Sequence, residues 1–144
     1  MKIDAFTHII TPKYREALYR RTDRRFYSGK WDSVIAATPG LWDIDNRLRI
    51  LDRYEGLAQV LTAASPAIEE SASPEDATYL AKLVNDEMAE LTVKYPDKFI
   101  AAVACLPMND IDAALKETDR AIKDLKFKGV QLYTPVNCKP LDAP

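Results

Sequence analysis

Four short apolar segments alternate with longer polar stretches along the chain. They are Ile3–Ile10, Leu57–Ser65, Phe99–Leu106 and Gly129–Thr134. The last three are nearly continuous hydrophobic runs, rather than the apolar and polar alternation of a strand with one face in water. Continuous runs favour parallel strands that are covered on both faces. The pattern therefore predicts four parallel strands.

Helical patterns lie between these segments. The stretch SPEDATYLAKLVNDEMAELTVKYPDKF has Ser73 as N-cap and Pro74 at the first helical position, and Tyr95 precedes the proline that should end the helix. The stretch NDIDAALKETDRAIKDLKFKG begins with Asn109 or Asp110 as its cap. Its apolar stripe consists of Ile111, Ala114, Leu115, Ile122 and Leu125. The earlier stretch DIDNRLRILDRYEG predicts a third helix.

The predicted order is a strand, a long irregular insertion, a helix, and then strands and helices in turn. This alternation favours an α/β fold with parallel strands and right-handed crossovers. Residues 1–144 form one domain by their length. We interpret residues 12–44 as a lid-like insertion, because long loops of α/β enzymes often carry substrate contacts. A folded-over structural excursion is the alternative.

Composition narrows the classes of partner. The formal net charge is −2, from 20 basic and 22 acidic residues, which gives no electrostatic reason to expect nucleic acid or an anionic membrane. No apolar run approaches the roughly 20 residues of a membrane span, and the start shows no signal-peptide pattern. Cys105 and Cys138 have no CxxC spacing. We therefore expect a cytoplasmic protein with reduced thiols.

The stretch IDAFTHIITP contains the only histidine of the chain, His8. Residues two apart share a face of a strand, so Asp4, Phe6 and His8 are expected to point one way. If that face is the inside of a barrel, His8 lies at the C-terminal mouth, where barrel enzymes place their chemistry. A neutral imidazole there can ligate a metal ion. A hydrogen-bonded structural histidine is the alternative.

IDAFTHIITPKY resembles the opening of the amidohydrolase superfamily, in the amidohydrolase 2 branch related to aminocarboxymuconate-semialdehyde decarboxylase, where the first strand usually reads I-D-x-H-x-H-x-x-P. The stretches RLRILDRYEGLAQVLTAASP, VNDEMAEL, YPDKFIAAVACLPMNDIDAAL and FKGVQLYTPVNCKPLD extend the resemblance in order over almost the whole chain. The resemblance implies parallel β/α units that form about half, the N-terminal half, of a TIM-type (β/α)₈ barrel. It also implies a metal-dependent decarboxylase or hydrolase of a small aromatic or unsaturated carboxylic acid.

The same resemblance implies a divalent metal ion, which in this family is commonly zinc. It also implies that His8 is the second histidine of the H-x-H pair. Phe6 stands in the place of the first histidine and cannot ligate a metal. The remaining metal ligands and the usual catalytic groups of the family lie beyond the end of the chain. The candidate substrate-binding residues are Trp42, Arg47, Asn109, Tyr133 and Asn137.

These five candidates rest on different arguments. The Trp42 ring suits a planar acid, and the fork of Arg47 suits a carboxylate. Asn109, Tyr133 and Asn137 follow strand ends. Packing for the tryptophan and a surface ion pair for the arginine are the alternatives.

Four strands leave the would-be interior face of a barrel uncovered, and uncovered apolar area predicts association. The cover is either a missing C-terminal half or a second copy of the chain. The second case is a homo-oligomer, and it describes a non-catalytic, self-associating α/β half-barrel. Phe6 favours it, because a packing group replaces a ligand there.

Overall fold

The computed structural model describes residues 1–22, 30–136 and 139–142, and the side chains of residues 30 and 31 are not described. In chain order the elements are β1 (Lys2–Ile9), α1 (Pro12–Arg21), α2 (Lys30–Ala37), the 3₁₀ helix η2 (Pro39–Leu41), α3 (Ile44–Leu51), β2 (Leu57–Ala63), α4 (Ile68–Ser71), α5 (Pro74–Lys94), β3 (Phe99–Ala102), β4 (Ala104–Cys105), α6 (Ile111–Lys123) and β5 (Val130–Gln131).

All paired strands run parallel. The order is β1-β2-β3 in one sheet and β4-β5 in a second one. β3 and β4 are two parts of the third predicted strand, on either side of Val103, whose N–H donates to the carbonyl of Leu61 (3.0 Å). If β3 and β4 are taken as one strand, the described strands correspond to the four predicted parallel strands, in the same order. The predicted fold class, parallel β/α units, is confirmed.

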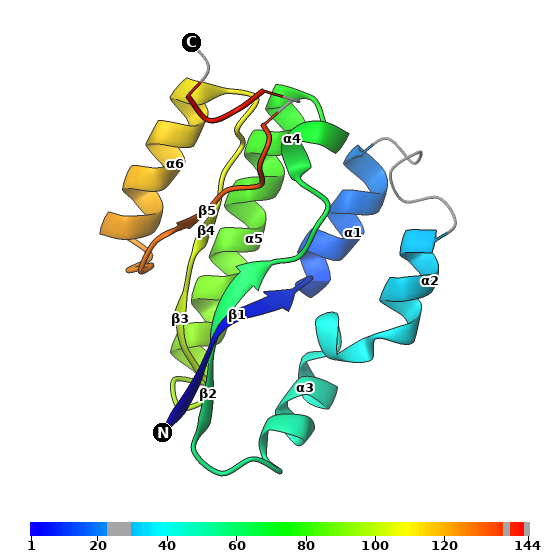
Figure 1. Cartoon of the computed structure of the whole chain (residues 1–144), viewed down its shortest axis with the longest axis vertical. Helices are drawn as coiled ribbons and strands as arrows, with labels where there is room; N and C mark the ends of the chain where they lie inside the picture. The colour runs from blue at the N-terminus through cyan, green and yellow to red at the C-terminus, as the bar shows by residue number, and fades with distance from the viewer. Residues whose placement is uncertain (23–29, 137–138, 143–144) are drawn as a thin grey trace.

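The helices lie on one side of the strands. In Figure 1, α5 runs behind β1 and β2, with α6 on its left and α1 on its right. Among the described residues no helix covers the face of the strands that is turned toward the viewer. The molecule thus has one packed face and one open face.

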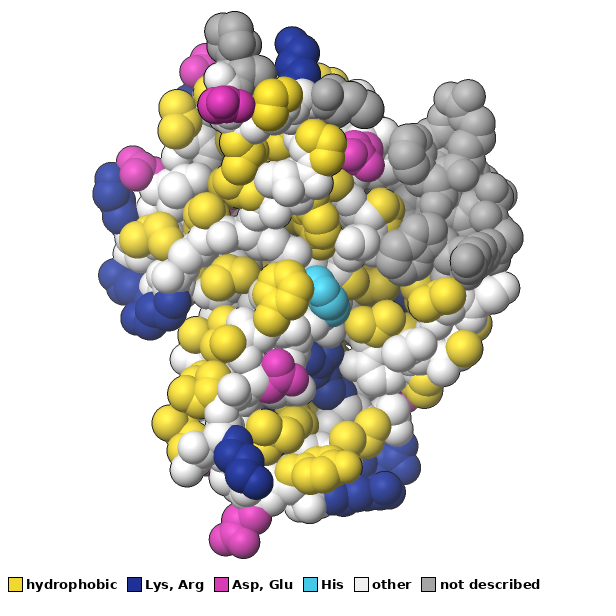
Figure 2. Space-filling view, in the orientation of Figure 1, with side chains coloured by type: hydrophobic (Ala, Val, Ile, Leu, Met, Phe, Trp, Pro, Cys, Tyr) yellow, Lys and Arg dark blue, Asp and Glu magenta, His cyan; other side chains and the backbone are white. Residues whose placement is uncertain are grey.

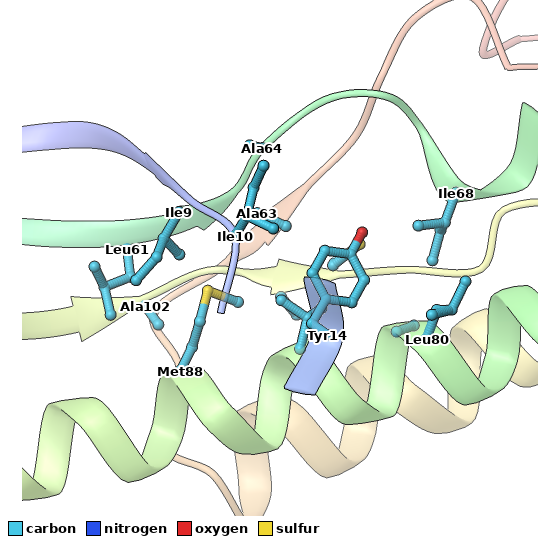
Figure 3. Packing of buried hydrophobic residues seen from close by; sticks show 14 of the residues in the cluster. Ile9, Ile10, Tyr14, Leu61, Ala63, Ala64, Ile68, Leu80, Met88 and Ala102 are labelled. Atoms are coloured by element: carbon cyan, nitrogen blue, oxygen red, sulfur yellow. The ribbon is translucent and has the colours of Figure 1, made fainter. Parts of the chain in front are cut away.

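The core lies between the strands and α5. Ile9 and Leu61 project from the strands onto Met88 of α5, as Figure 3 shows, and Tyr14 of α1 closes the same layer. All four side chains are fully buried. Burying one such apolar side chain contributes about 1.5–3 kcal/mol, so this layer is the main source of stability.

The helix ends follow the sequence signals. Ser73 caps α5 by accepting a hydrogen bond from the N–H of Asp76 (3.2 Å), and α5 ends one residue before Tyr95. Asp110 rather than Asn109 caps α6, through the N–H of Ala113 (3.0 Å). Short polar side chains satisfy the unpaired N–H groups of a first helical turn, which explains these boundaries.

The apolar stripe predicted for α6 is split in the structure. Ala114 is buried and Leu125 is partly buried, but the other three members are exposed. Their exposed fractions are 61% for Ile111, 64% for Leu115 and 41% for Ile122. The prediction that the stripe forms one buried face was therefore wrong.

Polar contacts decide which side of α6 is buried. Glu117 lies 1% exposed and accepts a hydrogen bond from Nδ2 of Asn85 on α5 (2.7 Å). Arg120 binds both Glu117 and Asp86, and these contacts raise the pKa of its guanidinium, first through Glu117. This network turns α6 so that three large apolar side chains face outward.

Residues 12–44 are not an irregular excursion throughout. They contain α1, α2 and η2, while residues 23–29 lie outside the described residues. The lid role of this segment stays a prediction. No helix in the described part of the chain is long and apolar enough to cross a bilayer, and the cytoplasmic location also stays a prediction.

A buried carboxylate fixes α1 against α5. Glu87 accepts hydrogen bonds from Oγ1 of Thr11 (2.7 Å), the N–H of Lys13 (3.1 Å) and the N–H of Tyr14 (2.8 Å). Two of these donors belong to the first turn of α1, where the helix dipole favours negative charge. Glu87 therefore places the helix that follows directly after the strand of His8.

Glu87→Ala should lower the free energy of unfolding by about 2–4 kcal/mol, because it leaves two buried donors and one partly buried donor unpaired. Urea denaturation measures the change. Glu90→Ala, an exposed position on the same helix, is the matched control and should change it by less than about 0.5 kcal/mol. Equal effects of the two substitutions would contradict the anchoring role.

Candidate functional site

His8 lies at the C-terminal end of β1, on the open face. Figure 2 shows its imidazole near the middle of that face, next to hydrophobic side chains. The pairing of β1 with β2 sets His8 opposite Thr62 and Ile9 opposite Ala63. The imidazole Nδ1 lies 3.3 Å from the carbonyl oxygen of Ala63 and 3.1 Å from Oγ1 of Thr62. The prediction that His8 stands at a strand end is confirmed.

These contacts favour one tautomer of the imidazole. A carbonyl oxygen only accepts hydrogen bonds, so the contact with Ala63 requires a proton on Nδ1, whereas the Thr62 hydroxyl can either accept from Nδ1 or donate to it. Nε2 then keeps its lone pair, which is the state in which a histidine ligates a metal ion. Thr62 is buried and was not among the sequence candidates, because its role depends on a partner 54 residues away.

Phe6 stands against His8. The ring centroids lie 4.7 Å apart in an edge-to-face arrangement, and Phe6 is 63% exposed. The two side chains therefore share the open face, as the sequence predicts. A register shift between Asp4 and Thr7 inserts one residue into β1, so alternation does not extend back to Asp4. The place of Asp4 on this face therefore stays a prediction.

Tyr133 reaches the same point from the other end of the chain. Its hydroxyl donates to the carbonyl oxygen of Ala63 (2.8 Å), which also lies next to Nδ1 of His8. Burial raises the pKa of Tyr133 to about 12, while hydrogen bonds with Ser65 and Gln131 oppose the rise. The structure thus brings the candidates His8 and Tyr133 together on one carbonyl group.

Asn109 lies at the loop after β4 and holds α4. Its Nδ2 donates to the carbonyl oxygens of Glu69 (3.3 Å) and Ala72 (3.1 Å). Its Oδ1 is buried with no hydrogen-bond partner among the described residues, and the same is true of Oε1 of Gln131. Two acceptors of this kind can receive donors from a bound molecule or from further chain, which keeps Asn109 a candidate.

Glu69 is a carboxylate that the sequence argument missed. It lies on α4 and is 6% exposed, and burial raises its pKa. Its charge also contributes to raising the pKa values of Cys105 and Tyr133. Nothing in the local sequence IEES marks Glu69 as buried, since Glu70 beside it is exposed.

Trp42 lies away from this group of residues. Its Nε1 donates to the carbonyl oxygen of Ile35 (2.9 Å), and the guanidinium of Arg15 stands 4.3 Å from its ring centroid. Both side chains line a hollow that also contains Asp43. The structure brings Trp42 together with α1 and α2, so its contact with substrate stays a prediction.

Arg47 is buried, with 7% of its surface exposed. Its partners are the carbonyl oxygens of His8 and Gly40 and the side-chain oxygen of Gln59. Burial lowers its pKa to about 10, opposed by the charge of Asp4. The surface ion pair considered from the sequence was therefore wrong, and binding of a substrate carboxylate stays a prediction. Asn137, the fifth candidate, lies outside the described residues.

The described residues offer one candidate metal ligand, His8, rather than a complete site. They contain no group of three or more His, Cys, Asp or Glu side chains that could hold an ion. A catalytic zinc ion usually takes about three protein ligands. Nε2 of His8 forms no hydrogen bond with the described residues and fits one ligand, so a metal site at this histidine would need further ligands.

A family model and the sequences of two known decarboxylases match this chain. The family model described as Amidohydrolase matches residues 3–144. A 2-amino-3-carboxymuconate-6-semialdehyde decarboxylase of Dictyostelium discoideum is 35% identical over 103 residues, which are 72% of this chain and 28% of that protein. A gamma-resorcylate decarboxylase of a Rhizobium species is 36% identical over 85 residues, which are 59% of this chain and 26% of that protein.

The fold has the same kind of neighbours. A dihydroxybenzoic acid decarboxylase of a Polaromonas species, solved with bound manganese and the inhibitor 2-nitroresorcinol, matches with a TM-score of 0.67 and 28% identity. The match covers 90% of this chain and 37% of that one. The chain therefore spans about a quarter to two fifths of the length of these proteins.

Tyr133 should make stability depend on alkaline pH. Its ordinary pKa of 10.0 rises to about 12 in the folded state, so the folded chain holds the phenol proton more tightly. This contribution is complete below pH 10 and is lost as the pH rises toward 12. Urea denaturation at several pH values should show a smaller loss across this window for Tyr133→Phe than for the wild type.

Tyr54→Phe, which alters an exposed tyrosine, is the control and should unfold like the wild type at pH 7. Identical pH profiles for the wild type and Tyr133→Phe would show that the phenol is not buried on Ala63.

Proposed function

Because the chain belongs to the amidohydrolase family, we propose that the complete protein is a metal-dependent decarboxylase of a small aromatic carboxylic acid. These 144 residues then provide the first four β/α units of its barrel. The observation that carries the proposal is His8 at the carboxyl ends of the parallel strands, with Nδ1 held by Ala63 and Nε2 free. Barrel enzymes place their reacting groups at this end.

The proposed cofactor is a divalent metal ion. The Polaromonas relative was solved with bound manganese, which supports a divalent ion but not zinc in particular. Zinc stays our specific proposal, and it rests on the family resemblance alone. When bound, such an ion acts as a Lewis acid on oxygen atoms that gain negative charge. In this chain His8 would contribute one nitrogen ligand, and Tyr133 would keep the Ala63 carbonyl in place behind it.

The proposed substrate is an aromatic acid with hydroxyl or amino substituents. The names of the relatives, decarboxylases of gamma-resorcylate and of dihydroxybenzoic acid, support this class. The unpaired acceptors of Asn109 and Gln131 suit donors of this kind. Trp42, Arg47, Tyr133 and Asn137 remain proposed contacts. Hydrolysis of a related acid is the alternative reaction, and release of CO₂ from gamma-resorcylate distinguishes the two.

His8→Ala in the complete protein should lower the affinity for Mn²⁺ by at least about tenfold, because a nitrogen ligand is lost. Metal analysis after dialysis and isothermal titration measure the effect. Arg49→Ala, exposed on α3, is the matched control and should bind like the wild type. Equal metal content in His8→Ala and the wild type would remove His8 from the site.

A second candidate function is self-association without catalysis, and the exposed apolar edges favour it. β1 and β5 are the outer staves, with Ile3 52% and Phe6 63% exposed on the first and Val130 40% exposed on the second. Leu115 on α6, the helix between β4 and β5 in the chain, is 64% exposed. Two copies related by a two-fold axis could cover both edges, giving a homo-oligomer of two half-barrels.

Leu115→Lys should convert a dimer of the 144-residue chain into a monomer, because a charge enters an apolar interface. Sedimentation velocity measures the species present. Lys116→Ala, at the neighbouring exposed position of α6, is the control and should stay dimeric. A wild-type chain that sediments as a monomer would exclude this candidate and leave the decarboxylase proposal untouched.

A further inference from the structure

Among the described residues, the strand that carries His8 pairs with a neighbouring strand on one side only. β1 is an outer strand whose neighbour in the sheet is β2, and its register shifts two residues before the histidine is reached. An edge strand with a bulge is free to twist unless other groups hold it. The position of His8 therefore needs a second support.

The α3 helix supplies that support through Arg47. Its Nη1 donates to the main-chain carbonyl oxygen of His8 at 2.7 Å and to that of Gly40 at 3.1 Å. Its Nε donates to Oε1 of Gln59 on β2 at 2.8 Å. One guanidinium thus joins the end of β1, the 3₁₀ helix η2 and the middle of β2.

A second contact closes the same corner. The N–H of Ile10 donates to the carbonyl oxygen of Leu41 in η2 (2.7 Å), so η2 covers the chain directly after His8. Arg47 and this bond hold the main chain at two successive points on the C-terminal side of the imidazole, the His8 carbonyl and the Ile10 N–H. The side-chain contacts of His8 with Ala63 and Thr62 then follow from a fixed backbone.

The arginine is costly to bury for packing alone. Its three acceptors are uncharged, and among the described residues no carboxylate forms an ion pair with it. The charge of Asp4 opposes the effect of burial on the pKa of Arg47, but burial is the larger effect and lowers that pKa to about 10. A buried cation that forms no ion pair is unfavourable unless its hydrogen bonds are good. Lys, with a single point of charge, cannot span Gln59 and His8 as a planar fork does.

We propose that Arg47 is a positioning residue, which fixes the main chain of His8 so that the imidazole binds Ala63 through Nδ1 and presents Nε2 to the open face. Its importance for metal binding rests on the proposed function, but the positioning itself does not. The positioning role comes in addition to the proposed substrate contact of Arg47, because it uses the hydrogen bonds that the guanidinium makes with His8, Gly40 and Gln59.

The single histidine makes this proposal measurable in the 144-residue chain without any metal. Long-range ¹H–¹⁵N NMR of the imidazole distinguishes the Nδ1–H from the Nε2–H tautomer. In the wild type we expect mostly Nδ1–H. In Arg47→Met and Arg47→Lys we expect its population to fall by about twofold, because the released imidazole approaches a mixture of tautomers.

Arg49→Met is the matched control. Arg49 lies on the same helix, is exposed and binds the side chain of Asn46, so the tautomer should not change. Urea denaturation is measured in parallel. A purely structural arginine would lower stability and leave the tautomer of the folded protein unchanged, and that result in either Arg47 variant would overturn the proposal.

Gln59→Leu covers the case in which both Arg47 variants fail to fold. It removes the partner of Nε while leaving the arginine in place, and should loosen the imidazole to a smaller extent. An unchanged tautomer in folded Gln59→Leu, when neither Arg47 variant folds, would count against positioning. Because no step uses metal or substrate, failure here is separate from failure of the decarboxylase proposal.

Discussion

The parallel pairing of β1 with β2 decides where the chemistry of this molecule can lie. Its register sets His8 opposite Thr62, and so brings the imidazole to the Ala63 carbonyl across 55 residues of chain. Tyr133 reaches the same oxygen from 70 residues away. A shift of one residue in this pairing would turn His8 toward the helices and leave the open face without a nitrogen ligand.

Buried polar side chains hold the helices to this pair of strands. Glu87 binds the start of α1, Asn85 binds both main-chain N–H and C=O of Cys105, and Arg47 binds the carbonyl of His8. Each side chain satisfies main-chain groups of a different element. Such contacts add little when made but cost much when one partner is removed, so they select one arrangement of the helices.

The open face of the strands carries the candidate functional residues that the family relationship makes relevant. The matched residues make up 28%, 26% and 37% of the three relatives, whose decarboxylase activity belongs to complete proteins. Here the histidine and the Tyr133 hydroxyl meet at the Ala63 carbonyl. Asn109 and Gln131 each keep a buried amide oxygen without a hydrogen-bond partner among the described residues. The Phe6 ring packs against the imidazole of His8. Phe6 replaces the first histidine of the H-x-H pair that the family resemblance implies, so it cannot act as a second metal ligand.

Local signals in the sequence determined the strands, the helices α3, α5 and α6, and their order, but not α1, α2 or α4. Continuous apolar runs identified the four parallel staves, and Ser73, Asp110 and Tyr95 marked helix ends, because strand burial and capping depend on residues close in the chain. The position of His8 followed from the same local pattern. Only the tertiary structure decided that Arg47 donates a hydrogen bond to the main-chain carbonyl of His8, that Glu69 is buried and that α6 turns its large apolar residues outward. These features depend on partners many residues away, and periodicity along one segment carries no information about what another segment places beside it.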